Sequence, residues 1–261
     1  MEVNIGCTGW GYEGWVGPFY PRGTKSSKFL NIYSSIFDIT EVNSTFYATP
    51  QKQVVKKWFA DTPAQFKFTA KIPQSITHER RMKNPSEGLE QFLEAMSSLK
   101  TKLLYCVIQL PPSLSFSEAM PNLEQLDSFD GFDYVIEGRH PSWFSDDATR
   151  YLSDKRICLV WSEVYNTKNP FPITSDFVYL RLIGDRAIPE KEFGNVVRDK
   201  TGDLKVWAER LRQVEDTISY AVIMANNHYE GFAPATANKM RTLLGLDKLT
   251  FLPDMQKKLD I

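Results

Sequence analysis

The hydrophobic pattern of this chain alternates between two periods. Eight short runs rich in β-branched, aromatic or other apolar residues are typical of buried strands. These runs cover residues 3–7, 39–43, 66–71, 105–110, 134–137, 157–161, 177–182 and 220–224. The segments between them carry apolar residues at spacings of three and four, which predicts helices, most clearly at residues 86–99 and 202–214 and more weakly at 32–37 and 54–59. Residues 162–176 show no such stripe, so we expect one outer helix to be missing there.

Regular alternation of strands and helices predicts a parallel sheet, because each parallel crossover needs about a dozen residues and a helix supplies them. Eight such units favour an α/β fold of the (β/α)8 type, a TIM barrel, and a doubly wound open sheet is the alternative. The 261 residues match the roughly 250 that such a barrel needs. We therefore expect residues 1–261 to form a single TIM-barrel domain without a regular helix after strand six.

Composition and charge narrow the functional classes. The formal net charge of -1 gives no overall field that would draw the protein to nucleic acid or an anionic membrane. The three cysteines, Cys7, Cys106 and Cys158, lie inside apolar runs and lack the spacing of a zinc site, which indicates buried thiols in a reducing compartment. No leader-like segment and no long apolar segment is present, so we expect a cytoplasmic protein without a membrane partner. Its oligomeric state is left open.

Polar side chains interrupt the strand pattern at the carboxyl end of most predicted strands. These residues are Glu41, Asn43, Lys71, Gln109, Glu137, Arg139, Arg181, Asn226, Asn227 and His228. Side chains alternate across a strand, so Glu41 shares a face with Asn43, and Glu137 with Arg139. If Phe68 faces the helices, Lys71 points toward the barrel axis. Barrel enzymes build their sites at this end, although a buried ion-pair network would satisfy the same residues.

All three histidines, His78, His140 and His228, follow predicted strands. Their shared position suggests acid/base chemistry or metal ligation. No motif requires a cofactor, and a divalent metal remains an alternative because barrel ligands can come from separate strands.

The glycines at positions 9, 11 and 14 have the GxGxxG spacing of a dinucleotide-binding turn. That turn should open a helix, but the glycine and proline residues at positions 17, 18, 21 and 23 prevent a prompt helix start. We expect an irregular loop that packs over the barrel. A second interpretation is a ligand lid in which Trp10, Tyr12 and their aromatic neighbours stack on a sugar or a base.

Several stretches together resemble the YecE-like family, catalogued as domain of unknown function seventy-two. They are residues 6–12 (GCTGWGY) with Trp15, 19–21 (FYP), 41–47 (EVNSTFY), 76–78 (ITH), 109–112 (QLPP), 137–143 (EGRHPSW), 179–181 (YLR) and 226–231 (NNHYEG). The resemblance spans nearly the whole chain and implies a TIM-barrel fold, but it implies no known reaction. Cys7 and Gly138 depart from the family pattern, where a small hydroxyl residue and a bulky apolar residue are usual.

Three functions are compatible with these residues. The first is an enzyme that acts on a small anionic substrate, such as a phosphorylated sugar or a nucleotide-like compound. Its expected catalytic residues are Glu41, Glu137, His140 and His228. Its expected substrate-binding residues are Trp10, Tyr12, Asn43, Tyr47, Lys71, His78, Gln109, Arg139, Trp143, Arg181, Asn226 and Asn227. Arginine can grip an oxyanion through two hydrogen bonds, and a carboxylate among cations would act as the base, which leaves histidine as the acid.

The second function is a metal-dependent hydrolase or isomerase, including a nucleic-acid phosphodiesterase, that uses the three histidines with Glu137. The third is a protein that binds a metabolite or RNA without catalysis, for which residues 78–83 offer a short basic patch. Nucleic acid is not the favoured partner.

Overall fold

A computed structural model describes residues 1–128, 131–163 and 171–251. Its centre is one nine-stranded sheet in which all neighbouring strands are parallel. The strands are β1 (Glu2–Cys7), β2 (Ile39–Val42), β3 (Lys67–Lys71), β4 (Leu103–Gln109), β5 (Tyr134–Glu137), β6 (Cys158–Leu159), β7 (Trp161–Ser162), β8 (Phe177–Leu182) and β9 (Tyr220–Ala225). Every strand predicted from the apolar runs is present, with ends that differ by one or two residues.

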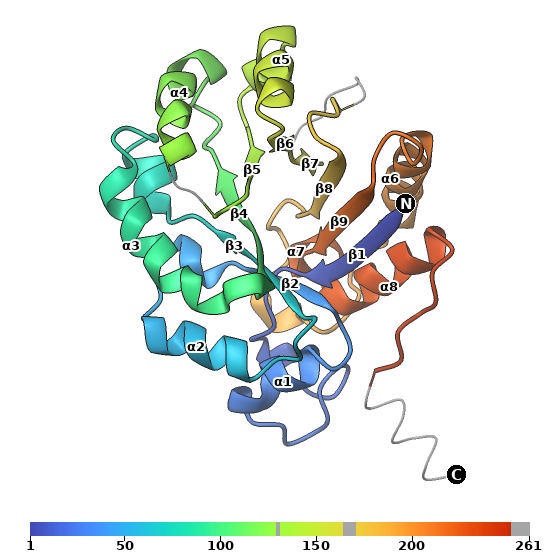
Figure 1. Cartoon of the computed structure of the whole chain (residues 1–261). Coiled ribbons are helices and arrows are strands. Elements are labelled where there is room, and N and C mark those ends of the chain that lie inside the picture. Colours follow the sequence, from blue (N-terminus) through green and yellow to red (C-terminus); the bar gives the residue numbers. More distant parts are fainter. Residues whose placement is uncertain (129–130, 164–170, 252–261) are drawn as a thin grey trace.

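The short strands β6 and β7 are two halves of the sixth predicted strand, separated only by Val160. The first half pairs with β5 and the second half pairs with β8, so the two ends of the sheet meet in one chain segment. The sheet therefore curls into a barrel that is closed apart from this interruption, and the open-sheet alternative is wrong. Figure 1 shows the strands around the centre of the molecule.

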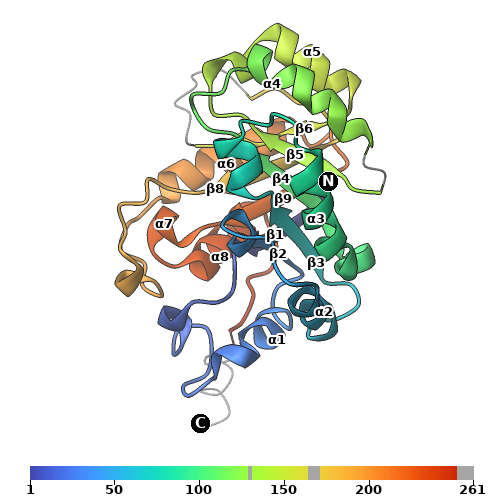
Figure 2. The same ribbon diagram turned by 90° about the vertical axis from the view of Figure 1, so that its left-hand side faces the viewer.

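The helices are α1 (Phe29–Tyr33), α2 (Lys52–Ala60), α3 (Ser86–Met96), α4 (Phe116–Leu123), α5 (Asp146–Asp154), α6 (Thr201–Gln213), α7 (Asn227–Glu230) and α8 (Ala233–Leu243). Most helices lie outside the strands, whereas the short α7 lies near the centre in Figure 1, directly after β9 (Figures 1 and 2). The two clearest predicted helices correspond to α3 and α6. The sequence predicts that residues 162–176 lack a regular helix. Residues 164–170 lie outside the described residues, and residues 171–176 are not helical.

The barrel interior is filled by apolar side chains from alternate strand positions. One core cluster comprises Ile39, Tyr105, Val107, Val135, Cys158, Val160, Phe177, Tyr179, Val222 and Met224. The intervening residues, such as Cys106, Ile136 and Ile223, belong to a second cluster that also contains the apolar residues of the helices. The next inward positions toward the carboxyl ends are Glu41, Gln109, Glu137 and Arg181. Strand periodicity therefore brings polar residues together above the apolar interior.

The glycine-rich loop after β1 packs on the barrel, as expected for an irregular loop. Only a three-residue 3-10 helix (Glu13–Trp15) follows its glycines. Trp15, Phe19 and Tyr20 are fully buried and contact one another. A Cβ atom at Gly14 would lie 2.0 Å from the carbonyl oxygen of Phe193, so glycine at this position permits close contact with the loop after β8.

Cys7, Cys106 and Cys158 are buried free thiols, as their apolar surroundings predicted. Within the described part of the chain, no helix has both the length and the apolar character needed to span a membrane.

Gly6 offers a test of the packing between β1 and β2. A Cβ atom at Gly6 would lie 2.1 Å from the carbonyl oxygen of Ile39, whereas one at Gly11 would have no neighbour within 4 Å. We expect Gly6→Ala to lower the free energy of unfolding by about 1–3 kcal/mol, because backbone must move to relieve the overlap. Gly11→Ala is the control and should change it by less than about 1 kcal/mol. Urea denaturation measures both, and equal stability of the two variants would contradict this account.

Candidate functional site

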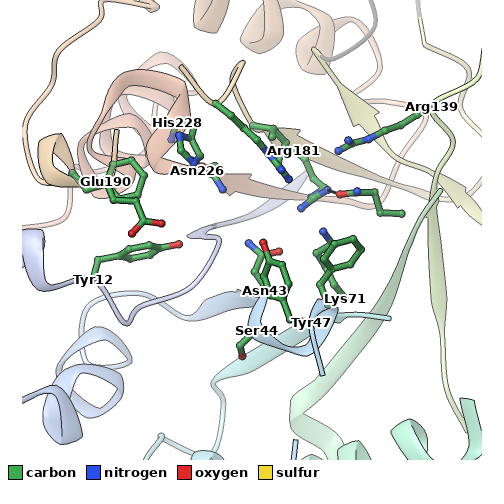
Figure 3. A pocket seen from close by; sticks show the side chains of 15 residues that line it. Tyr12, Asn43, Ser44, Tyr47, Lys71, Arg139, Arg181, Glu190, Asn226 and His228 are labelled. Atoms are coloured by element: carbon green, nitrogen blue, oxygen red, sulfur yellow. Dashed lines mark hydrogen bonds between the residues drawn. The ribbon is translucent and has the colours of Figure 1, made fainter. Parts of the chain in front are cut away.

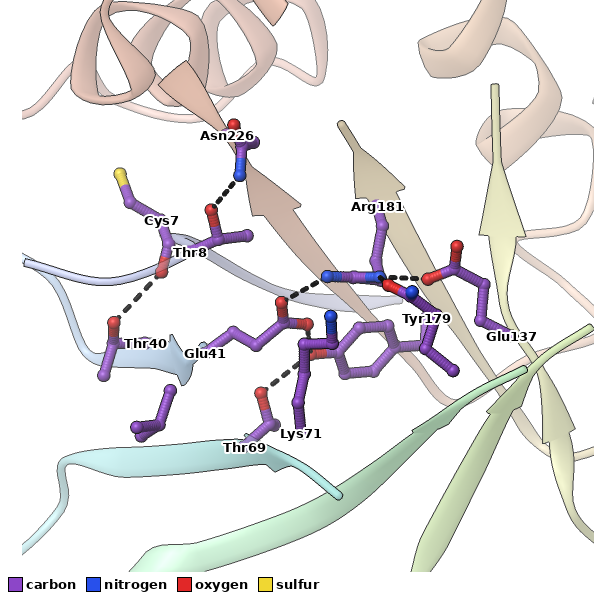
Figure 4. A network of polar contacts seen from close by, with 12 residues as sticks. Cys7, Thr8, Thr40, Glu41, Thr69, Lys71, Glu137, Tyr179, Arg181 and Asn226 are labelled. Atoms are coloured by element: carbon purple, nitrogen blue, oxygen red, sulfur yellow. Dashed lines mark hydrogen bonds and ion pairs between the residues drawn. The ribbon is translucent and has the colours of Figure 1, made fainter. Parts of the chain in front are cut away.

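A buried guanidinium lies at the centre of the polar layer at the top of the barrel. Arg181 of β8 contacts the carboxylate of Glu41 from β2 at 2.7 Å and that of Glu137 from β5 (Figure 4). The exposed fractions of these three side chains are 2%, 0% and 1%, so solvent screens the ion pairs very little. Three strands that are distant in sequence are thus joined by one cation.

Neighbouring side chains use most of the remaining hydrogen-bonding capacity of this cluster. The hydroxyl of Tyr179 donates to Oε2 of Glu41 at 2.9 Å and lies 2.7 Å from Oγ1 of Thr69. Arg139 donates to Oε1 of Glu137 at 2.7 Å, and Arg181 also donates to Oε1 of Gln109 at 3.2 Å. We call Glu41, Glu137, Arg139 and Arg181 the ion cluster.

Electrostatics keeps Glu137 and Arg181 charged. Burial alone would raise the pKa of Glu137, but Arg181, Arg139 and Lys71 together lower it to about 2. Burial likewise acts to lower the pKa of Arg181, and the two carboxylates overcome it and raise that pKa above its ordinary value. Glu137 is therefore an anion at neutral pH and has two cationic partners, which makes it a poor proton acceptor.

A cavity of about 430 Å³ opens above the ion cluster, at the carboxyl ends of the strands (Figure 3). It is lined by Tyr12, Asn43, Ser44, Phe46, Tyr47, Lys71, Gln109, Arg139, Arg181, Ile183, Arg186, Glu190, Phe193, Asn226 and His228. Asn43 and Lys71 reach it from one side, and Arg181, Asn226 and His228 from the other. These residues come from strands and loops that are far apart in the sequence, and the structure brings them to one cavity.

Lys71 ends β3 and is 4% exposed. Its Nζ lies 3.7 Å from the centroid of the Phe46 ring. Among the described residues, no carboxylate or other acceptor bonds to this amine (Figure 4). Burial and the positive charge of Arg181 lower the pKa of Lys71 to about 7, although Glu41 and Glu137 act in the opposite direction.

Three buried polar atoms of the cavity-lining residues have no hydrogen-bond partner among the described residues: Oδ1 of Asn43, Nε of Arg181 and Nδ1 of His228. Burial lowers the pKa of His228, and the Ile188 backbone opposes this in part. The imidazole is therefore neutral at pH 7. A buried polar atom without a partner carries the cost of its desolvation.

The catalytic candidates divide between the cavity and its surroundings. His228 lines the cavity, whereas Glu41 and Glu137 belong to the ion cluster below it. His140 accepts a hydrogen bond from the backbone N–H of Ser142 at 3.2 Å and so caps a short 3-10 helix. His78, an expected substrate-binding residue, packs edge-on behind Phe46 with ring centroids 5.1 Å apart, and burial and the charge of Lys71 lower its pKa to about 4.

Besides His78, three expected substrate-binding residues lie outside the cavity lining and have packing roles. Trp143 is fully buried against Gly138, where a Cβ atom would lie 2.1 Å from its indole, so this departure from the family pattern makes room for the ring. Asn227 accepts hydrogen bonds from the Trp15 indole at 3.1 Å and the Ala233 backbone at 2.9 Å. Trp10 packs edge-on against Trp58, with ring centroids 5.6 Å apart.

The sequence reasoning missed Ser44, Phe46, Ile183, Arg186, Glu190 and Phe193. The most informative of these is Arg186, an exposed cation whose backbone is left-handed (φ 60°). Asp185 shapes this turn, because its carboxylate accepts from the Ala187 N–H at 3.0 Å and from Arg198 at 2.9 Å. The signal that could have found Arg186 is its place in a Gly-Asp-Arg turn directly after a strand that already carries Arg181.

Across residues 1–128, 131–163 and 171–251, no three His, Cys, Asp or Glu side chains are grouped so that they could hold a metal ion. The three histidines occupy separate surroundings: the cavity, the back of Phe46 and a helix cap. The geometry thus offers little support for a metal site made of the three histidines and Glu137.

Arg181 offers a test of the ion cluster. We expect Arg181→Met to lower the free energy of unfolding by about 3–5 kcal/mol, because it leaves two buried carboxylates without their shared partner. The triple variant Glu41→Gln, Arg181→Met, Glu137→Gln should recover part of that loss, since no buried carboxylate is then unpaired. Urea denaturation of both variants measures this. A triple variant no more stable than the single one would show that the loss has another cause.

Lys71 should make stability depend on pH. The folded-state pKa of about 7 lies below the ordinary value of 10.5, so the unfolded chain binds more protons between these values and wild-type stability rises with pH across that window. We expect Lys71→Met to be more stable than the wild type at pH 7, and this advantage to shrink by up to about 1.4 kcal/mol per pH unit toward pH 10.

Lys67→Met is the control, because Lys67 ends in a hydrogen bond to the Thr101 carbonyl at the surface. Denaturant unfolding between pH 7 and 10 should show a nearly constant difference for Lys67→Met. The same constant difference for Lys71→Met would mean that this amine is not held neutral by its surroundings.

Comparisons with known proteins agree with the barrel and with the family resemblance. A family model described as "Protein of unknown function DUF72" matches residues 4–259. UPF0759 protein YecE of Escherichia coli is 32% identical over 144 residues, which are 55% of this chain and 50% of that protein. UPF0759 protein YunF of Bacillus subtilis is 32% identical over 153 residues, or 55% of this chain and 52% of its own length. The matched segment spans about half the length of these curated relatives.

Two solved structures share the architecture. A DUF72 family protein from Thermotoga maritima superposes with a TM-score of 0.78 at 27% identity, covering 94% of this chain and all of its own (100%). A DUF72 family protein from Enterococcus faecalis gives a TM-score of 0.73 at 21% identity over 94% of this chain and 98% of its own, which shows a shared fold. With a family model that matches nearly the whole length and relatives of the same barrel fold, this chain belongs to the DUF72 family.

Proposed function

We propose that this protein is an enzyme that acts on a small anionic substrate by acid/base chemistry in the cavity above the ion cluster. The observation that carries the proposal is the charge of the cavity lining. Among its described residues, three carry guanidinium groups (Arg139, Arg181 and Arg186), one carries the amine of Lys71, and one, Glu190, is acidic. A site that concentrates cations in a protein of net charge -1 favours a local anion.

The three guanidinium groups differ in what they can offer a ligand. Both terminal nitrogens of Arg181 contact the carboxylates of the ion cluster, so Arg181 serves as the floor of the cavity. Arg139 is 15% exposed and keeps donors beyond its bonds to Glu137. Arg186 has no hydrogen-bond or ion-pair partner among the described residues, and its left-handed turn holds its backbone at the rim of the cavity. We therefore assign anion binding to Arg139 and Arg186, which can offer paired N–H donors to a phosphate or carboxylate.

Proton transfer is assigned to His228. Its lowered pKa leaves the imidazole neutral at pH 7, so it can accept a proton, whereas sequence reasoning had favoured histidine as an acid. Its unpartnered Nδ1 and the unpartnered Oδ1 of Asn43 both suit a hydroxyl group of the substrate. Tyr47, which is 70% exposed at the rim, supplies an aromatic face for a sugar or a base.

A nucleic-acid partner has weaker support. Within the basic patch at residues 78–83, Arg81 forms a two-fold ion pair with Glu118, with nitrogen–oxygen distances of 2.9 and 2.8 Å. This pairing reduces the positive field that a phosphate backbone would meet.

Arg186→Gln tests the anion site. We expect this variant to bind phosphorylated sugars or dicarboxylates from a metabolite panel about 10- to 100-fold more weakly than the wild type, as loss of a hydrogen bond from a charged donor implies. A thermal-shift screen identifies the ligand, and isothermal titration calorimetry measures its affinity. Arg150→Gln is the matched control, because Arg150 is an arginine 73% exposed on α5 that does not line the cavity.

A ligand that binds both variants as tightly as the wild type would place the anion site elsewhere. A screen in which only neutral compounds stabilise the wild type would overturn the proposed substrate class.

A further inference from the structure

One side chain in the cavity is not explained by anion binding alone. Lys71 is a buried amine whose Nζ rests on the face of Phe46, 3.7 Å from the ring centroid. An ammonium group has three donors and normally finds acceptors when it is buried. Lys102, which is 3% exposed, shows the usual arrangement, since its Nζ donates to the Phe59 carbonyl at 2.7 Å and the Thr62 carbonyl at 2.8 Å. Lys71 has no such bond among the described residues.

The carboxylates nearest to Lys71 already have partners. In the ion cluster, Glu41 pairs with Arg181, and Glu137 pairs with both Arg181 and Arg139. Two carboxylates and two guanidiniums cancel in formal charge, so a protonated Lys71 would be a fifth and uncompensated charge. The arrangement favours the neutral amine, which carries a lone pair.

We propose that Lys71 is a nucleophile that forms an imine with an aldehyde or ketone bearing a carboxylate or phosphate group. This inference rests on the proposed function, because Arg139 and Arg186 would hold the anionic end of the same substrate. The Phe46 ring limits the space on one side of Nζ, while the cavity leaves the other side accessible to a carbonyl group.

The step is balanced without any further reactant. The lone pair of Nζ adds to the carbonyl carbon, so a C–N bond forms and the C=O π bond becomes an O–H bond in a carbinolamine. Loss of water then breaks the remaining C–O bond, and both amine protons leave with the oxygen. The imine takes up one proton from solvent and becomes an iminium ion, which withdraws electrons from the adjacent carbon.

The surroundings of the amine support this role. Burial and Arg181 lower the pKa of Lys71, Glu41 and Glu137 raise it, and Arg139 lowers it again, with a result of about 7. His78, which faces Lys71 from behind Phe46, is neutral at that pH because its own pKa is about 4. Compared with an ordinary lysine, roughly a thousandfold more of this residue is free amine at pH 7.

Reductive trapping tests the proposal. The full chain is incubated at pH 7 with glyoxylate, pyruvate or glyceraldehyde 3-phosphate and then with sodium cyanoborohydride, and adducts are located by mass spectrometry of peptides. We expect at least one of these anionic carbonyl compounds to modify Lys71 at least 100-fold faster than Lys67. Lys67 is the internal control, because it lies on the same strand but bonds to the surface carbonyl of Thr101. Neutral glycolaldehyde should react with Lys71 more slowly than its anionic counterparts.

Two variants separate this inference from the proposed function. Lys71→Arg removes the amine nucleophile and should bind the anionic compounds in calorimetry but yield no adduct at position 71. Arg186→Gln should weaken binding and slow trapping at Lys71 together. If the wild type binds these compounds but modification of Lys71 is absent or no faster than that of Lys67, the imine is wrong and anion binding stands. If none of the compounds binds or reacts, both the imine and this substrate class are wrong.

Discussion

A guanidinium held between two carboxylates organises the carboxyl-terminal end of this barrel. Arg181 comes from β8, Glu137 from β5 and Glu41 from β2, and all three are buried. Strands β5 and β8 flank the segment of β6 and β7, where backbone pairing passes from one neighbour to the other at Val160. The contact between Arg181 and Glu137 spans that interruption. Because removing charges from water is costly, such a cluster persists only when every member is paired, and this requirement fixes the relative positions of the three strands.

The same pairing decides which groups are left for chemistry. Carboxylates such as Glu41 and Glu137 often serve as general bases. Here both pair with arginines of the ion cluster and lie below the cavity lining. The amine of Lys71 and the imidazole of His228 border the cavity, and burial lowers the pKa of both. An amine with a pKa of about 7 and a neutral imidazole beside guanidinium donors make a site suited to an anionic substrate whose reacting carbon is electrophilic. The ion cluster is thus the support for the site, and the reactive groups are its neighbours.

Membership of the DUF72 family establishes the barrel and leaves the reaction to be argued from side chains, since one fold hosts many chemistries. The barrel brings the ends of all its strands to one place, and the loops after β1, β2 and β8 complete the lining with Tyr12, Phe46 and Arg186. The glycine-rich loop contributes through packing, because Gly14 lets it approach Phe193, a cavity residue. Of the three glycines with the dinucleotide-like spacing, Gly14 makes this contact, whereas a Cβ atom at Gly11 would meet nothing within 4 Å.

The sequence by itself determined the order of strands and helices and the set of polar residues that face inward. These features follow from local periodicity, because a period of two assigns each strand residue to one face, as it did for Glu41, Lys71 and Arg181. Only the tertiary structure decided that Arg181 pairs with Glu41 and Glu137 while Lys71 has no counter-ion in the described part of the chain. It also decided that Trp143 and Asn227 serve packing and that Arg186 reaches the cavity. Those outcomes depend on distances between strands and loops far apart in the chain, and charge compensation and burial are set by such distances rather than by any local pattern.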